Sequence, residues 1–127
     1  MLVAYTMIGA SDLEKSWAFY DAVLGLLGAE RNAQYSGEKR SWYQAPGMPA
    51  GMLAVGAPFE GHASGGNGVM VALMAKDTAT VDAAHTKALE LGATSEGAPG
   101  PRGPQWYGAY FRDFDGNKVA VFTLVRG

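Results

Sequence analysis

The 127-residue chain has no cysteine. This absence excludes disulfide bridges, thiolate metal ligands and a cysteine nucleophile. It also favours a reducing compartment, and we expect the protein in the cytoplasm.

The chain also lacks long runs of charge and of apolar residues. Ten Lys and Arg residues are scattered against twelve acidic ones, and Lys39-Arg40 is the longest basic cluster, so nucleic acid is not an expected partner. No apolar run approaches the length of a membrane span, so we expect no membrane partner. Residues 1–8 are apolar but few and without a basic lead, which is typical of a strand and not of a signal peptide. The size predicts a single domain over residues 1–127.

What the chain does contain is an internal repeat. Residues 3–12 lead into a helical pattern that ends at Gly28, and 65 residues later residues 69–77 lead into another that ends at Gly92. The repeat predicts halves 1–60 and 67–127, and an α+β fold in which two tandem β-α-β-β-β modules form a cupped mixed sheet. We expect the functional site in the cup.

Each expected helix has recognisable ends. Ser11 and Glu14 have the spacing of a capping box, which predicts the start of the first helix. The second helix is predicted from about Thr78 to Leu91. The apolar stripe of the first helix is formed by Leu13, Trp17, Tyr20, Leu24 and Leu27.

Two hairpins are predicted, from residues 38–45 with 51–57 and from residues 107–112 with 118–125. Asp113, Asp115 and Asn117 lie in the second turn, and we interpret them as turn-forming residues and not as a catalytic or calcium site. Residues 58–67 and 97–105 are rich in Gly with Ser or Pro, and they are predicted to be loops.

Two segments of the chain resemble the signatures of a known superfamily. They are residues 8–16 (IGASDLEKS) with Phe19-Tyr20, and residues 111–118 (FRDFDGNK). The chain thereby resembles the glyoxalase, bleomycin-resistance and extradiol-dioxygenase superfamily, also called vicinal oxygen chelate, over its whole length. The resemblance implies the glyoxalase-like fold. In members with lyase, isomerase or dioxygenase chemistry, it also implies a divalent metal in the cup that binds two substrate oxygens.

The resemblance assigns the metal ligands to four positions. The first ligand of the family, usually His, corresponds to Tyr5, seven residues before Asp12, and its repeat partner corresponds to Met70. The Glu of the last strand corresponds to Ala120, and the fourth position lies near Leu53, to within a residue or two. Because these side chains are poor ligands or none, we predict no metal and no other cofactor.

A displaced metal site could draw only on other residues. His62, Glu60 and His85 are conceivable ligands, but His62 lies in the joining loop, His85 on the second helix, and they lack i, i+4 spacing. We interpret His62 as a surface loop residue and His85 as part of a solvated helix face.

The predicted lining of the cup is apolar and aromatic, with one phenol at Tyr5. It suits a small aromatic or otherwise planar molecule, with Arg102 placed to meet an anionic group. The alternating apolar residues could equally form ordinary core. Trp42, Tyr43, Trp106, Tyr107 and Tyr110 supply flat surfaces. The predicted ligand-binding residues are Tyr5, Met7, Trp42, Met52, Met70, Ala72, Arg102, Trp106, Tyr107, Tyr110 and Ala120.

Three functions remain open at this point. The first is a metal-free protein that binds a small organic molecule in the cup. The second is a lyase, an isomerase or a dioxygenase-like enzyme, metal-independent or with a displaced metal, in which Tyr5 acts as acid or base. The third is a non-catalytic dimeric interaction module. We expect a homodimer in every case, because exposed strand edges are templates for pairing.

Overall fold

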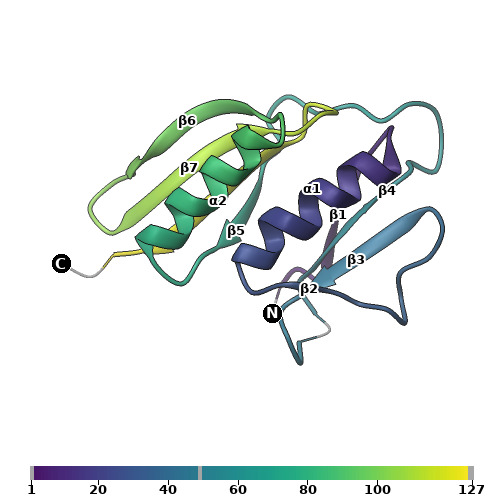
Figure 1. The fold of residues 1–127 in the computed structure, drawn as a ribbon, viewed down its shortest axis with the longest axis horizontal. Coiled ribbons are helices and arrows are strands. Elements are labelled where there is room, and N and C mark those ends of the chain that lie inside the picture. The colour runs from purple at the N-terminus through teal and green to yellow at the C-terminus, as the bar shows by residue number, and fades with distance from the viewer. Residues whose placement is uncertain (1, 49, 126–127) are drawn as a thin grey trace.

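The structure, a computed structural model, describes residues 2–48 and 50–125. It consists of two four-stranded mixed sheets, each with one helix (Figure 1). The elements of the first half are β1 (Tyr5–Gly9), α1 (Leu13–Leu26), β2 (Glu30–Arg31), β3 (Arg40–Gln44) and β4 (Met52–Gly56). Those of the second are β5 (Val71–Met74), α2 (Thr78–Glu90), β6 (Thr94–Pro101), β7 (Trp106–Arg112) and β8 (Lys118–Leu124).

The two halves share one topology. The strand orders are β1-β4-β3-β2 and β5-β8-β7-β6, with one parallel pair in each sheet, β1 with β4 and β5 with β8. The predicted α+β fold of tandem β-α-β-β-β modules is therefore confirmed. Across the described ranges, no helix is long and apolar enough to cross a membrane.

Each sheet has a face covered by a helix and a face without one, which we call the open face. Figure 1 shows each helix lying along its own sheet, with α1 and α2 packed beside one another. Side chains alternate across the strands, so Leu53 and Val55 enter the core while Met52 and Ala54 belong to the open face of β4. The same alternation places Val119 and Val121 of β8 in the core.

The predicted capping box of the first helix is wrong by one residue. Asp12 is the N-cap of α1, and its side chain accepts a hydrogen bond from the backbone N–H of Lys15 at 3.1 Å. Asp77 caps α2 in the same way, at 2.8 Å from the N–H of Thr80. Ser11 is free to donate its hydroxyl to Asp115 of the other half. Asp12 can replace Ser11 in this role because aspartate is as favourable as serine at the N-cap of a helix.

The buried face of α1 is wider than the predicted stripe. Phe19 and Val23 are fully buried in addition to Tyr20 and Leu24, whereas Trp17 is only partly buried. Phe19 lies edge to face with Phe111 at 5.7 Å between ring centroids. The extra apolar positions exist because α1 packs against the second half as well as its own sheet.

Two other predictions from the sequence are wrong. Residues 97–105 are not all loop, because β6 covers Thr94–Pro101 and pairs with β7 through two register shifts, which break the alternation that identifies a strand. His85 is not solvated. It is 5% exposed, and its Nε2 lies 3.0 Å from the Ser95 hydroxyl of β6. Burial lowers the pKa of His85.

The turn between β7 and β8, residues 113–117, joins the two halves, and we call it the clasp. The predicted turn chemistry is confirmed, since Asp113 accepts hydrogen bonds from the N–H groups of Asp115 and Asn117. Asp113 also accepts one from the Tyr20 hydroxyl at 2.6 Å, and Asn117 Nδ2 donates to the Gly9 carbonyl at 2.9 Å. The clasp therefore fixes the first strand and helix to the second sheet.

The joining loop passes close over the clasp. The N–H of Gly65 donates to the Asp115 carbonyl at 2.8 Å. A Cβ at Gly65 would lie 2.0 Å from the Gly116 oxygen, so only glycine fits here.

Removing the Tyr20 hydroxyl should weaken the attachment of the two halves. Tyr20 is 1% exposed, and its hydroxyl bonds a charged acceptor that stays partly buried. We expect Tyr20→Phe to lower the free energy of unfolding by about 2 kcal/mol, measured by urea denaturation. Tyr35→Phe removes an exposed hydroxyl and should change it by less than about 0.5 kcal/mol. Equal stability of Tyr20→Phe and the unaltered protein would show that the clasp does not depend on this bond.

Candidate functional site

The open face of the first sheet holds one aromatic pocket, which we call the N-terminal pocket. Its cavity of about 600 Å³ is lined by Ala4, Tyr5, Gln34, Tyr35, Trp42, Ala50 and Met52. Tyr5 pairs with Met52 of β4, and the rings of Tyr5 and Trp42 meet edge to face across that strand, 4.9 Å apart. None of the described residues that line this pocket is charged.

Tyr5 stands at the edge of the N-terminal pocket without a polar partner. Tyr5 is 56% exposed. Within residues 2–48 and 50–125, no hydrogen bond reaches the Tyr5 hydroxyl from another side chain. No described side chain therefore fixes the direction of this hydroxyl.

The open face of the second sheet holds the C-terminal pocket. Its cavity of about 480 Å³ is lined by Ala72, Leu73, Met74, Arg102, Trp106, Tyr110 and Phe122. Phe122 of β8 pairs with Gly108 of β7, and a Cβ at Gly108 would lie 2.3 Å from the Phe122 ring. The ring therefore lies across a glycine, where no side chain competes for its place.

Two further aromatic side chains flank Phe122. Trp106 and Tyr110 stand on either side of Gly108 along β7, and they meet the Phe122 ring edge to face at 6.0 Å and 5.5 Å. Such perpendicular pairs are a preferred geometry for aromatic rings. The pocket consequently has three aromatic walls whose mutual positions are fixed by the strand pairing.

Arg102 is the charged residue of the C-terminal pocket. It follows β6 and is half-buried. Its Nη2 donates to the Ala98 carbonyl at 2.6 Å and its Nη1 to the Pro101 carbonyl at 3.1 Å. The guanidinium carbon lies 5.3 Å from the centre of the Tyr110 ring.

A third, smaller cavity lies between the facing edges of the two sheets. It measures about 320 Å³, and its walls include Met52, which also lines the N-terminal pocket, Ala72, which also lines the C-terminal pocket, and Met70. It also includes Val3, Thr6, Gly51, Leu53, Val71 and Leu73. The predicted lining residues thus divide: Tyr5, Trp42 and Met52 face one pocket, Ala72, Arg102, Trp106 and Tyr110 face another, and Met70 lies between the sheets.

Three predicted lining residues reach none of these cavities. Met7 and Ala120 are absent from their walls, and Ala120 is fully buried. Tyr107 points to the helix-covered face, where its hydroxyl donates to Asp82 of α2 at 2.6 Å. That bond raises the pKa of Tyr107.

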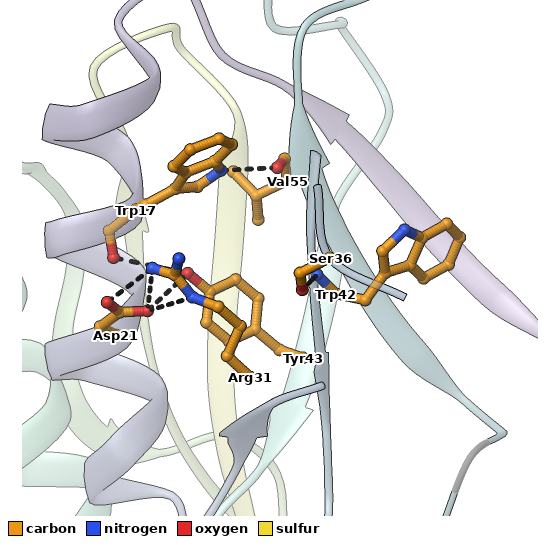
Figure 2. A network of polar contacts seen from close by, with 7 residues as sticks. All are labelled: Trp17, Asp21, Arg31, Ser36, Trp42, Tyr43 and Val55. Atoms are coloured by element: carbon orange, nitrogen blue, oxygen red, sulfur yellow. Dashed lines mark hydrogen bonds and ion pairs between the residues drawn. The ribbon is translucent and has the colours of Figure 1, made fainter. Parts of the chain in front are cut away.

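Tyr43 behaves in the same way as Tyr107. Its hydroxyl donates to Asp21 of α1 at 2.8 Å, and burial followed by this bond raises its pKa well above the usual value. Figure 2 shows Tyr43 and its neighbour Trp42 on opposite sides of β3. Adjacent strand residues cannot both face the same pocket, so the predicted flat surfaces at Tyr43 and Tyr107 are wrong.

The Asp21 side of β3 is instead a structural network (Figure 2). Arg31 forms a bidentate ion pair with Asp21 at 2.7 Å and 2.8 Å, which raises the pKa of Arg31. The indole N–H of Trp17 donates to the Val55 carbonyl at 2.8 Å. These contacts hold α1 on the back of the sheet that carries the N-terminal pocket.

The register corrects the fourth position assigned by resemblance. Leu53 faces the core and cannot be equivalent to Ala120. Met7 and Ala72 each lie five residues before the aspartate that caps the next helix, and they pair with Ala54 and Ala120. Ala54 is therefore the counterpart of Ala120.

The four positions now read Tyr5, Ala54, Met70 and Ala120. Two methyl groups, a thioether and a phenol do not fit the needs of a divalent cation, which takes imidazole, thiolate or carboxylate ligands. Over the parts of the chain that the structure describes, no three His, Cys, Asp or Glu residues are grouped closely enough to hold a metal ion. His62 lies exposed in the joining loop, as predicted, while His85 is buried against Ser95.

Several pocket residues were not predicted. Met74 follows Ala72 by two residues on β5, so the alternation that selected Ala72 would also have selected Met74. Phe122 follows Ala120, a position assigned by the resemblance, by two residues on β8 and shares its face of the strand. Gln34 and Tyr35 carry no such signal, because they lie between β2 and β3 in a segment without periodicity.

The sequence and the fold are similar to those of known proteins. The model of the Glyoxalase/Bleomycin resistance protein/Dioxygenase superfamily matches residues 2–121. A glyoxalase/bleomycin resistance protein from Albidiferax ferrireducens T118 is 34% identical, with a TM-score of 0.86 over 97% of this chain and 98% of that one. A comparison with curated proteins gave no match.

Two more distant structures bear more specific names. A lactoylglutathione lyase from Agrobacterium tumefaciens is 25% identical, with a TM-score of 0.65 over 95% of this chain and 92% of that chain. A fosfomycin resistance protein from Mesorhizobium loti is 18% identical, with a TM-score of 0.65 over 97% and 91%, and it shows the fold alone. With the family model covering nearly the whole sequence, the resemblance seen in residues 8–16, Phe19-Tyr20 and residues 111–118 is confirmed, and the chain belongs to the Glyoxalase/Bleomycin resistance protein/Dioxygenase superfamily.

Proposed function

We propose that this protein binds a small planar organic molecule on its aromatic open face, without a divalent metal. The observation that carries the proposal is the C-terminal pocket, where Trp106, Tyr110 and Phe122 surround a cavity of about 480 Å³. Aromatic walls with few polar groups are typical of sites that hold flat, apolar ligands by contact area. Because the walls sit on paired strands, the pocket is largely formed before the ligand arrives.

The chemistry of the ligand positions supports the metal-free part of the proposal. The chelation of two substrate oxygens needs a cation, and Tyr5, Ala54, Met70 and Ala120 offer it at most a phenol and a thioether. We therefore derive no step through a metal.

Binding is favoured over catalysis by Tyr5. An activated phenol is normally oriented by a hydrogen bond to a neighbouring group, and Tyr5 has no such bond to a described side chain. The lactoylglutathione lyase is an enzyme by name, but no His, Asp or Glu is among the described residues that line the C-terminal pocket, and the Tyr110 phenol ring there packs against Arg102 and Phe122.

We also propose that the protein is a cytoplasmic homodimer. Val3, Val69 and Met70 are apolar and exposed at the facing edges of the two sheets, and β1 and β5 each have one unpaired edge. Unpaired edges and exposed apolar side chains together favour association of two copies.

A matched pair of probes tests ligand binding. We expect 2-naphthoate, 2-naphthamide or both to bind saturably, with a dissociation constant below about 1 mM, in the presence of EDTA. The three tryptophans give the readout by NMR: the indole N–H signals of Trp106 or Trp42 should shift, while that of Trp17, bonded to Val55, should stay. Binding of neither probe, or binding that EDTA abolishes, would overturn the proposal.

Subunit number is a separate prediction. Sedimentation equilibrium at micromolar concentration should give twice the chain mass of 13.3 kDa. Met70→Glu, which places a charge at the facing edges, should shift the protein toward the monomer. Leu89→Glu, at an exposed position of α2, is the control and should leave the dimer intact. A monomeric unaltered protein would contradict the expected homodimer.

A further inference from the structure

The guanidinium of Arg102 lies next to two glycines of β6, Gly97 and Gly100, which leave room for it. A Cβ at Gly97 would come within 3.3 Å of Arg102 Nη2 and 2.8 Å of the Tyr110 ring, and one at Gly100 within 3.2 Å of Arg102 Nη1. Both glycines belong to β6, at its register shifts with β7. The two glycines of this irregular strand thus leave space for the guanidinium to pack against the Tyr110 ring.

The guanidinium is held in place before any ligand binds. Its two bonds to the Ala98 and Pro101 carbonyls and its contact with the Tyr110 ring fix the end of a long side chain. A fixed side chain loses little rotamer freedom when it binds a ligand. Two of its five N–H donors are used, so donors remain for a ligand.

No carboxylate among the described residues forms an ion pair with Arg102. The ion pairs among residues 2–48 and 50–125 are Arg31 with Asp21, Lys87 with Glu90, and Arg112 with Glu96. Of the residues that the structure describes, no acidic one lines the C-terminal pocket. Lys118 also lies near Tyr110, with its Nζ 5.2 Å from the ring centre, but it is not among the residues that line the cavity.

We propose that the C-terminal pocket selects planar aromatic carboxylates, with the carboxylate on Arg102 and the ring system among Trp106, Tyr110 and Phe122. This inference rests on the proposed function and adds the charge of the ligand and the half of the molecule that binds it. Arginine suits the task because its planar fork of donors matches a carboxylate and its bonds to an ion are stronger than neutral ones. The ring contacts and the single charge together define an aromatic monoanion.

The N-terminal pocket provides an internal contrast. Its polar groups are Gln34, two phenols and the indole of Trp42, all uncharged. Because these groups carry no charge, we expect this pocket to bind a carboxylate no more tightly than an amide of the same shape. A preference for the anion must therefore come from the C-terminal pocket and be reported by Trp106 and not by Trp42.

The test compares 2-naphthoate with the isosteric neutral 2-naphthamide by calorimetry. In the unaltered protein, we expect the naphthoate to bind about tenfold more tightly, as a charge-assisted hydrogen bond provides. Arg102→Met should reduce this ratio to about one while leaving the naphthamide affinity within about twofold. Raising the salt concentration should also reduce the ratio, because the pocket is open to solvent.

Arg40→Met is the matched control, since Arg40 lies on the open face of the first sheet and its Nη2 bonds the Ala57 carbonyl. It should keep the tenfold ratio. Thermal unfolding of both variants checks that they fold. In NMR, naphthoate should shift the Trp106 indole signal and leave that of Trp42 in place.

Each contrary result has a distinct meaning. Equal affinity for the two probes in the unaltered protein would overturn the anion preference and leave the proposed planar-ligand function standing. If the preference for naphthoate survives Arg102→Met, or if naphthoate shifts the indole signal of Trp42, the assignment to Arg102 and this pocket is overturned. Failure of both probes to bind would overturn the proposed function and this inference together.

Discussion

The hydrogen bond from Tyr20 to Asp113 is the constraint on which the arrangement of the two halves depends. Tyr20 comes from the first helix and is buried, so its hydroxyl must find a partner inside the protein, and the partner it finds belongs to the last hairpin of the other half. Burial and then the Asp113 charge raise the pKa of Tyr20, which keeps the hydroxyl a donor. Asn117 and Asp115 extend the same attachment to Gly9 and Ser11.

The clasp joins the two halves away from the open faces of the sheets, so these faces remain accessible to ligands. Small residues on the strands determine which side chains line the open faces. Gly108 lets Phe122 lie flat between Trp106 and Tyr110, and Gly97 with Gly100 lets Arg102 lie against Tyr110. Ala54 and Ala120 stand where metal-binding relatives carry a ligand, according to the resemblance. The same fold that can hold a metal thus presents aromatic pockets here, one of them with a fixed cation.

The elements with strong local signals could be predicted from the sequence. The two helices end two residues before Gly28 and Gly92, which have positive φ angles, and the last hairpin turns at residues 113–117 as its Asp, Gly and Asn residues indicate. Long-range effects could not be read in this way. The register shifts of β6 break the alternation of its side chains, so this strand was predicted as a loop, and the burial of His85 depends on that same strand. Tyr107 was misplaced because two neighbouring aromatics were assigned to one face of a strand, against the alternation that the structure follows.

Native mass spectrometry of freshly purified protein, prepared without added metal or chelator, tests the central claim most directly. One spectrum reports any metal ion and any small molecule that stays bound to the chain. The account predicts a mass without a divalent ion, either alone or with an organic molecule attached. One divalent ion per chain would contradict it, because the residues at Tyr5, Ala54, Met70 and Ala120 leave no place for that ion in the site described.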